Sequence, residues 1–135
     1  MSPNDTQTSP AEDLGLAEPN KDVVEDKIWV AMVRKVIEQQ FHDPSFSPSM
    51  LASELSMSQR TLQRKFKLQF GMSVREFISV VRLEKASEML MACDTITDVA
   101  FACGFNEPSY FAQRFKQRFG VSPSQFIEDN RVGSD

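Results

Sequence analysis

The segment RTLQRKFKLQFGMS, residues 60–73, is nearly repeated as SYFAQRFKQRFGVS at residues 109–122. Apolar residues recur every four positions in both copies, and each run stops at a glycine, as amphipathic helices do. The matched pairs are all 49 positions apart, since 111 minus 62 is 49. Leu62, Phe66, Phe70, Gly71, Ser73, Phe77 and Ile78 correspond to Phe111, Phe115, Phe119, Gly120, Ser122, Phe126 and Ile127. The chain therefore contains one structural unit twice.

Upstream of each copy the correspondence continues, but at a separation of 48. Leu51, Ala52 and Leu55 correspond to Val99, Ala100 and Cys103. The turn of the second copy must therefore hold one extra residue. A short helix with a small alanine, a turn of about four residues and a longer helix make a helix-turn-helix, because alanine lets the two helices cross closely.

Start and stop signals divide the rest of the chain into helices. An apolar period of three and four residues begins at Val23, and Ser47, Ser58, Ser73, Thr95 and Ser122 are suitable N-caps for the helices that follow. The prediction is an all-α fold of seven helices in residues 23–131, with no strand. Two helix-turn-helix subdomains, at about 46–72 and 95–121, are joined by a long linker helix at about 73–92. Residues 1–22 are predicted to be a disordered acidic tail or an interdomain linker.

The net charge of −4 conceals an asymmetry along the chain. The first 20 residues hold four acids and no base, and so account for the whole net charge. Residues 58–92 carry seven bases against three acids, a local excess of +4. Such a stripe is compatible with phosphate binding, although on charge alone a solvated helix face is equally possible.

The longer helix of the first copy has a polar face opposite its apolar stripe. Its members follow the helical steps i, i+3, i+4 and i+7: Arg60, Gln63, Arg64 and Lys67. Arginine pairs with guanine and glutamine with adenine in the major groove, which is wide enough to admit a helix. Lys65 and Lys67 are better suited to phosphate, which adds affinity without sequence information. This face is predicted to contact DNA.

The second copy carries a different outer face, made of Ser109, Tyr110, Ala112, Gln113 and Lys116. It has fewer side chains that pair strongly with base edges. The helix between the copies, residues 74–91, spans about 27 Å at about 1.5 Å per residue. With the turns added, the two reading helices could lie about one DNA turn, ~34 Å, apart. The repeat thus predicts that one chain enters two successive major grooves.

Two stretches closely resemble the C-terminal DNA-binding domain of the AraC/XylS family of bacterial transcription regulators. They are ITDVAFACGFNEPSYFAQRFKQRFGVSPSQF for the second helix-turn-helix and LASELSMSQRTLQRKFK for the first, and the likeness covers about residues 26–130. It implies a seven-helix fold, an asymmetric promoter site bound by a monomeric domain, and activation through RNA polymerase. The base-facing positions that match are Arg60, Gln63, Arg64, Ser109, Tyr110, Ala112 and Gln113. Gln113 departs from the arginine of many members, so the base preference of the second half-site stays open.

Members of this family usually carry a separate ligand or dimerisation domain. The acidic, proline-containing tail resembles an interdomain linker, which favours part of a longer regulator over a complete stand-alone activator. The N-terminus has neither a basic nor an apolar region of the kind a secretory signal needs, and no apolar run is long enough to span a membrane. The expectations are a cytoplasmic chain with no membrane association, no cofactor and no small-molecule site.

Two other classes of function compete with DNA binding. An enzyme is disfavoured, because His42 is the only histidine and no paired carboxylates, nucleophile elbow or phosphate loop accompany it. No catalytic or metal-binding residue is predicted, and Cys93 and Cys103 are expected to be structural. An all-helical protein-interaction module without DNA binding remains the alternative, since grooves between helices can receive partner helices.

Overall fold

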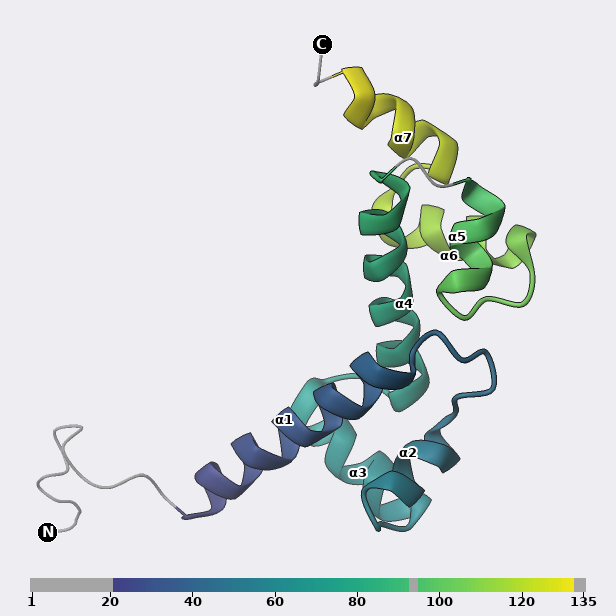
Figure 1. Cartoon of the computed structure of the whole chain (residues 1–135). Helices are drawn as coiled ribbons and strands as arrows, with labels where there is room; N and C mark the ends of the chain where they lie inside the picture. Colours follow the sequence, from purple (N-terminus) through teal and green to yellow (C-terminus); the bar gives the residue numbers. More distant parts are fainter. Residues whose placement is uncertain (1–20, 93–94, 133–135) are drawn as a thin grey trace, which may run out of the picture. The chain divides into compact units, whose positions relative to one another are not determined.

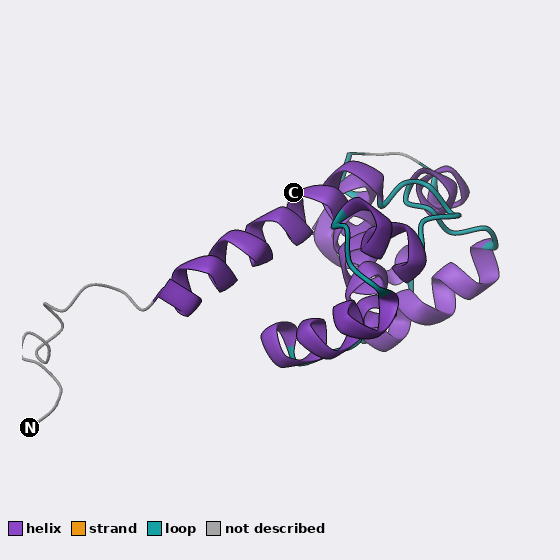
Figure 2. Ribbon diagram, turned by 90° about the horizontal axis from the view of Figure 1, so that it is seen from below, coloured by secondary structure: helices purple, strands orange, loops and turns teal. Residues whose placement is uncertain are grey.

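The computed structural model describes residues 21–92 and 95–132, and within these all regular structure is helical (Figure 2). The helices are α1 (Lys21–Gln40), α2 (Pro48–Glu54), α3 (Gln59–Phe70), α4 (Val74–Leu90), α5 (Ile96–Ala102), α6 (Pro108–Phe119) and α7 (Pro123–Val132). The predicted all-α fold of seven helices is confirmed for the described part of the chain.

Two compact units divide the chain, residues 1–32 and 33–135. Of the first unit, residues 21–32 are described, and they are helical. Both predicted helix-turn-helix subdomains and the linker helix belong to the second unit. The predicted tail lies outside the described residues except for its last two positions, and its boundary at residue 22 stays a prediction.

Hydroxyl side chains begin five of the helices where the sequence indicates. Each accepts a hydrogen bond from the backbone N–H three residues later, at distances of 3.1 to 3.4 Å: Ser47, Ser58, Ser73, Thr95 and Ser122. These bonds satisfy donors that the first turn of a helix otherwise leaves free. The α3 and α6 helices end at glycines in the left-handed conformation, whose N–H groups donate to the carbonyls of Lys67 and Lys116.

Helix α4 is shared between the two subdomains. Its first half buries Val74, Phe77 and Ile78, and its second half buries Leu83, Ala86 and Leu90. In Figure 1, α3 lies beside the start of α4, whereas α5, α6 and α7 gather around its far end, and all four helices contact it. Each end of the linker helix therefore forms part of a different core.

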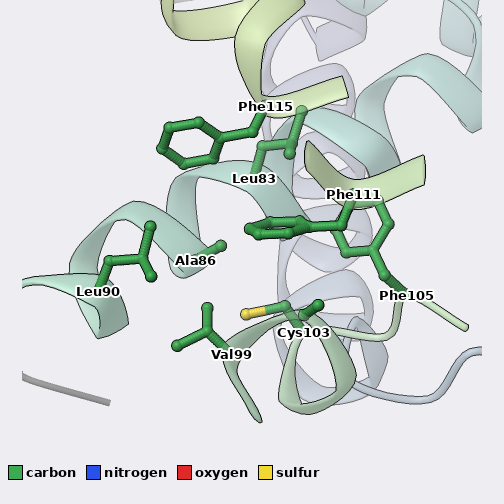
Figure 3. Close-up of a cluster of buried hydrophobic side chains, with 9 residues drawn as sticks. Leu83, Ala86, Leu90, Val99, Cys103, Phe105, Phe111 and Phe115 are labelled. Atoms are coloured by element: carbon green, nitrogen blue, oxygen red, sulfur yellow. The ribbon is translucent and has the colours of Figure 1, made fainter. Parts of the chain in front are cut away.

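Both cores repeat one aromatic arrangement. In the first, the Phe66 ring lies 4.2 Å from that of Phe70 and 5.5 Å from that of Phe77. The corresponding distances in the second, from Phe115 to Phe119 and Phe126, are 4.4 and 5.3 Å. Figure 3 shows the second core, where side chains of α4, α5 and α6 meet. The 49-residue repeat thus extends from sequence to packing.

Candidate nucleic-acid interface

The predicted DNA-contact face of α3 lies opposite its buried stripe. Leu62 and Phe66 are completely buried, and the four predicted contact residues of this helix, Arg60, Gln63, Arg64 and Lys67, are all exposed. Lys65 is half-buried, so it belongs less clearly to this surface. The helix therefore presents a continuous polar face while a stripe of apolar side chains anchors it.

The same arrangement recurs in α6. Phe111 and Phe115 are completely buried, whereas the predicted residues Ser109, Tyr110, Gln113 and Lys116 are exposed and Ala112 is half-buried. Tyr110 leaves 53% of its surface exposed. Each predicted set of contact residues is therefore brought together on its own helix, and whether they contact DNA remains a prediction.

The turns of the two helix-turn-helix units have the same hydrogen bonds. The N–H of Met57 donates to the carbonyl of Ala52 at 2.9 Å, and that of Phe105 donates to Ala100 at 3.0 Å. One residue earlier, Ser56 and Gly104 adopt the left-handed conformation, with φ of 56° and 90°. Residues 55–58 connect the first pair of helices and residues 103–107 the second. The predicted extra residue in the second turn is confirmed.

Arg82 of α4 lies beside this second turn and links α4 to the segment that follows α1. Its Nε donates to the carbonyl of Phe41 at 2.9 Å, and its Nη2 donates to that of Asp43 at 2.8 Å. Burial of the guanidinium lowers the pKa of Arg82 by desolvation, against the opposing effect of Asp43. A Cβ at Gly104 would lie only 2.4 Å from the carbonyl oxygen of Phe41 and 2.8 Å from Nε of Arg82. The second turn is thus packed tightly against the segment that precedes α2.

Several bases are engaged within the protein. Arg118 pairs with Glu84 at 2.7 Å, and Lys85 pairs with Glu38 at 2.9 Å. Arg114 donates to Ser79 at 3.1 Å and to Gln117 at 3.0 Å. The basic stripe inferred from residues 58–92 is therefore smaller than predicted, because Arg82 and Lys85 have partners within the protein. A count along the chain could not detect this, since their partners come from other segments.

Other bases have no hydrogen-bond or ion-pair partner among the described residues. Five of them lie on α3, at the start of α4 and on α6: Arg60, Arg64, Lys67, Arg75 and Lys116. All five are exposed. Exposed, unpaired cations on and beside the two reading helices form a surface suited to a polyanion. Arg75 is the member that sequence analysis missed, because α4 was assigned only a spacing role.

No group of three or more metal-ligating side chains comes together in residues 21–92 and 95–132. Cys103 is buried, with Sγ 3.5 Å from Sδ of Met89, and burial raises the pKa of its thiol to about 11. This agrees with the structural role expected for Cys103, whereas Cys93 lies outside the described residues. Within the same part of the chain, no helix is both long and apolar enough to cross a membrane.

Residues 51–129 match the model of a helix-turn-helix domain family. Transcriptional activator NphR from Rhodococcus sp is 35% identical over 104 residues, which cover 76% of this chain and 31% of NphR. The transcriptional activator RhaR of Pectobacterium atrosepticum is 49% identical over 70 residues, 51% of this chain and 25% of RhaR. The chain spans about a third of the length of such curated relatives, 29 to 31% for three of them.

Solved structures share the fold. The C-terminal domain of AraT, a response regulator from Geobacillus stearothermophilus, is 30% identical with a TM-score of 0.71, covering 74% of this chain and 84% of that one. The DNA-binding domain of AdpA, a global transcriptional factor solved in complex with a target DNA, is 27% identical with a TM-score of 0.71. That comparison covers 76% of this chain and 92% of the AdpA domain.

Proposed function

The chain belongs to the AraC/XylS family of helix-turn-helix transcription regulators, and we propose that it binds an asymmetric promoter site through α3 and α6. The observation that carries the proposal is the pair of exposed polar faces on equivalent helices, each opposite completely buried apolar side chains. One helix would enter each of two successive major grooves. The AdpA domain, which was solved with a target DNA, supports DNA binding by a domain of this fold.

The two helices have different parts in this proposal. From α3, the base edges are read by Arg60, Gln63 and Arg64. Lys67 contacts phosphate, which adds affinity without sequence information. The base-facing residues proposed for α6 are Ser109, Tyr110, Ala112 and Gln113, and Lys116 faces the DNA backbone. Of this second set, only Gln113 can form a bidentate pair with adenine.

The proposal extends to regulation. Relatives such as NphR and RhaR are named activators, which supports the same role for this chain. Contact with RNA polymerase at the promoter is the route to activation that we propose. The proposed setting is the bacterial cytoplasm, where the DNA lies. Because the similar proteins are transcription regulators, we assign the chain no enzymatic activity.

The alternative, a helical protein-interaction module, makes an opposite prediction about salt. Binding to phosphates releases counterions, so affinity for random-sequence duplex should fall steeply between two salt concentrations. A module that binds only protein helices would show no such duplex binding. Titration of the purified chain by fluorescence anisotropy distinguishes the two functions. Selection of bound sequences from a random DNA pool then supplies the site for the tests below.

Arg60→Ala and Arg64→Ala are each expected to weaken binding to the selected site by about 1 to 3 kcal/mol, because each removes a bidentate base contact. In both variants, the preference for particular bases should relax in one half-site only. Lys67→Ala should instead weaken all sequences to a similar degree. Affinities for the selected site and for single-base variants of it measure both effects. Unchanged binding in both arginine variants, with circular dichroism showing intact folding, would exclude these residues as readers.

A single chain should occupy a site with two unequal reading segments about 10 to 10.5 bp apart, centre to centre. Inserting five base pairs between the segments would turn one of them to the far side of the duplex. The expected loss is about 1 to 3 kcal/mol, the worth of one good bidentate pair such as Gln113 can make. Stoichiometry by analytical ultracentrifugation and affinity on the two duplexes are the measurements. Obligate dimeric binding to a palindrome, or indifference to the insertion, would contradict the proposal.

A further inference from the structure

A concave pocket of about 340 Å³ adjoins the reading face of α3. Its wall includes Gln63 and Lys67 from α3, and Ser73, Val74 and Arg75 from the start of α4. Gln63 and Lys67 belong to the face proposed to read DNA, so the pocket opens beside that face. Arg75 extends the same surface onto the linker helix.

The charge of this pocket is entirely positive. Lys67 and Arg75 line it, and none of its lining residues is acidic. Neither cation has an ion-pair or hydrogen-bond partner among residues 21–92 and 95–132, and both are exposed. The pocket around Arg114 and Arg118 differs, because there Glu76 also lines the wall and Arg118 pairs with Glu84. Two unpaired cations in one hollow suit a single phosphate, which accepts hydrogen bonds from both guanidinium and ammonium groups.

Arg75 also marks where this phosphate would lie along the DNA. It lines a second, larger cleft of about 500 Å³, whose wall includes Asn106, Glu107 and Tyr110 of the other helix-turn-helix unit. Arg75 is therefore the cation that borders both the α3 pocket and the cleft leading to α6. Its place at both hollows suits a contact with DNA between the two reading segments.

We propose that Lys67 and Arg75 hold a backbone phosphate of the DNA in the spacer between the two reading segments, with Arg75 as its principal ligand. The inference rests on the proposed function, because it takes the strand bound by α3 and α6 as its ligand. It adds a part for α4, which contributes a contact to the DNA as well as a fixed spacing.

The test uses the full chain with the selected duplex and with a random-sequence duplex. Arg75→Ala is expected to bind both about tenfold more weakly, the effect of one charge-assisted hydrogen bond. The slope of log K against log salt should become shallower by about 0.9, the share of one phosphate contact. Arg75→Lys should restore the slope because it keeps the charge. Lys35→Ala, which removes an exposed base of α1 that does not line the pocket, is the matched control and should leave the slope unchanged.

Methylphosphonate substitution locates the phosphate. Replacing one phosphate at a time with this neutral group should reveal a spacer position that weakens wild type but not Arg75→Ala. An unchanged salt slope in Arg75→Ala, or coupling only to phosphates outside the spacer, would overturn the inference while leaving the proposed function intact. A loss confined to the selected duplex would make Arg75 a base reader and also overturn it. If wild type binds neither duplex in a salt-dependent way, both proposals fail.

Discussion

Replacing Phe115 with alanine is expected to lower the free energy of unfolding by about 3 to 5 kcal/mol, the usual cost of removing a buried aromatic side chain. Phe115 is completely buried and its ring lies 4.4 Å from that of Phe119 and 5.3 Å from that of Phe126. In Figure 3 it lies near Leu83 of α4. Phe115 therefore helps to hold α6 against both α4 and α7, and the cavity left by alanine would weaken this packing.

Phe66→Ala should have an effect of the same size on the first core, because its ring occupies the equivalent place against Phe70 and Phe77. Urea unfolding followed by circular dichroism measures both variants. Phe101→Ala is the matched control, since 50% of the Phe101 side chain on α5 is exposed and surface substitutions change stability by about 0.5 kcal/mol or less. If Phe66→Ala and Phe115→Ala unfolded at the wild-type urea concentration, the buried faces would be wrongly assigned.

The features that sequence analysis predicted are those that depend on local chemistry. N-cap hydroxyls, terminal glycines and apolar residues at four-residue steps all act within one helix, so they could be recognised one segment at a time. The two separations of 48 and 49 residues also located the extra residue in the second turn. The repeat strengthens each of these predictions, because a feature found in the first copy can be checked at the matching position of the second.

The features that could not be predicted depend on residues distant in the chain. Arg82 and Arg75 are both arginines of one helix and contribute equally to a count of charge. Only the folded structure shows that Arg82 donates to the carbonyls of Phe41 and Asp43, whereas Arg75 faces two hollows without a partner in the described part of the chain. Whether a cation is available to DNA depends on its three-dimensional neighbours. Lys85 illustrates the same limit through its ion pair with Glu38.

The role of Gly104 also depends on residues distant in the chain. Its substitution should be among the most damaging in the domain. The first turn tolerates a serine at the equivalent position, Ser56, at a φ of 56°. Gly104 has a φ of 90°, and a Cβ there would meet the carbonyl oxygen of Phe41 and the guanidinium of Arg82. Gly104→Ala should therefore combine a left-handed backbone penalty of about 1 to 2 kcal/mol with an overpacking cost of about 1 to 3 kcal/mol.

Gly120→Ala separates these two costs. Gly120 has a φ of 84°, but a Cβ there would meet nothing within 4 Å, so alanine should bring only the backbone penalty of about 1 to 2 kcal/mol. The difference between the two variants in urea unfolding then isolates the contact of the second turn with Phe41 and Arg82. We expect Gly104→Ala to be the less stable by about 1 to 3 kcal/mol, the overpacking cost alone. Because Arg82 can move whereas the Phe41 carbonyl belongs to the backbone, Arg82→Ala should relieve little of that difference. Equal stabilities for the two glycine variants would show that the second turn does not press against the segment before α2.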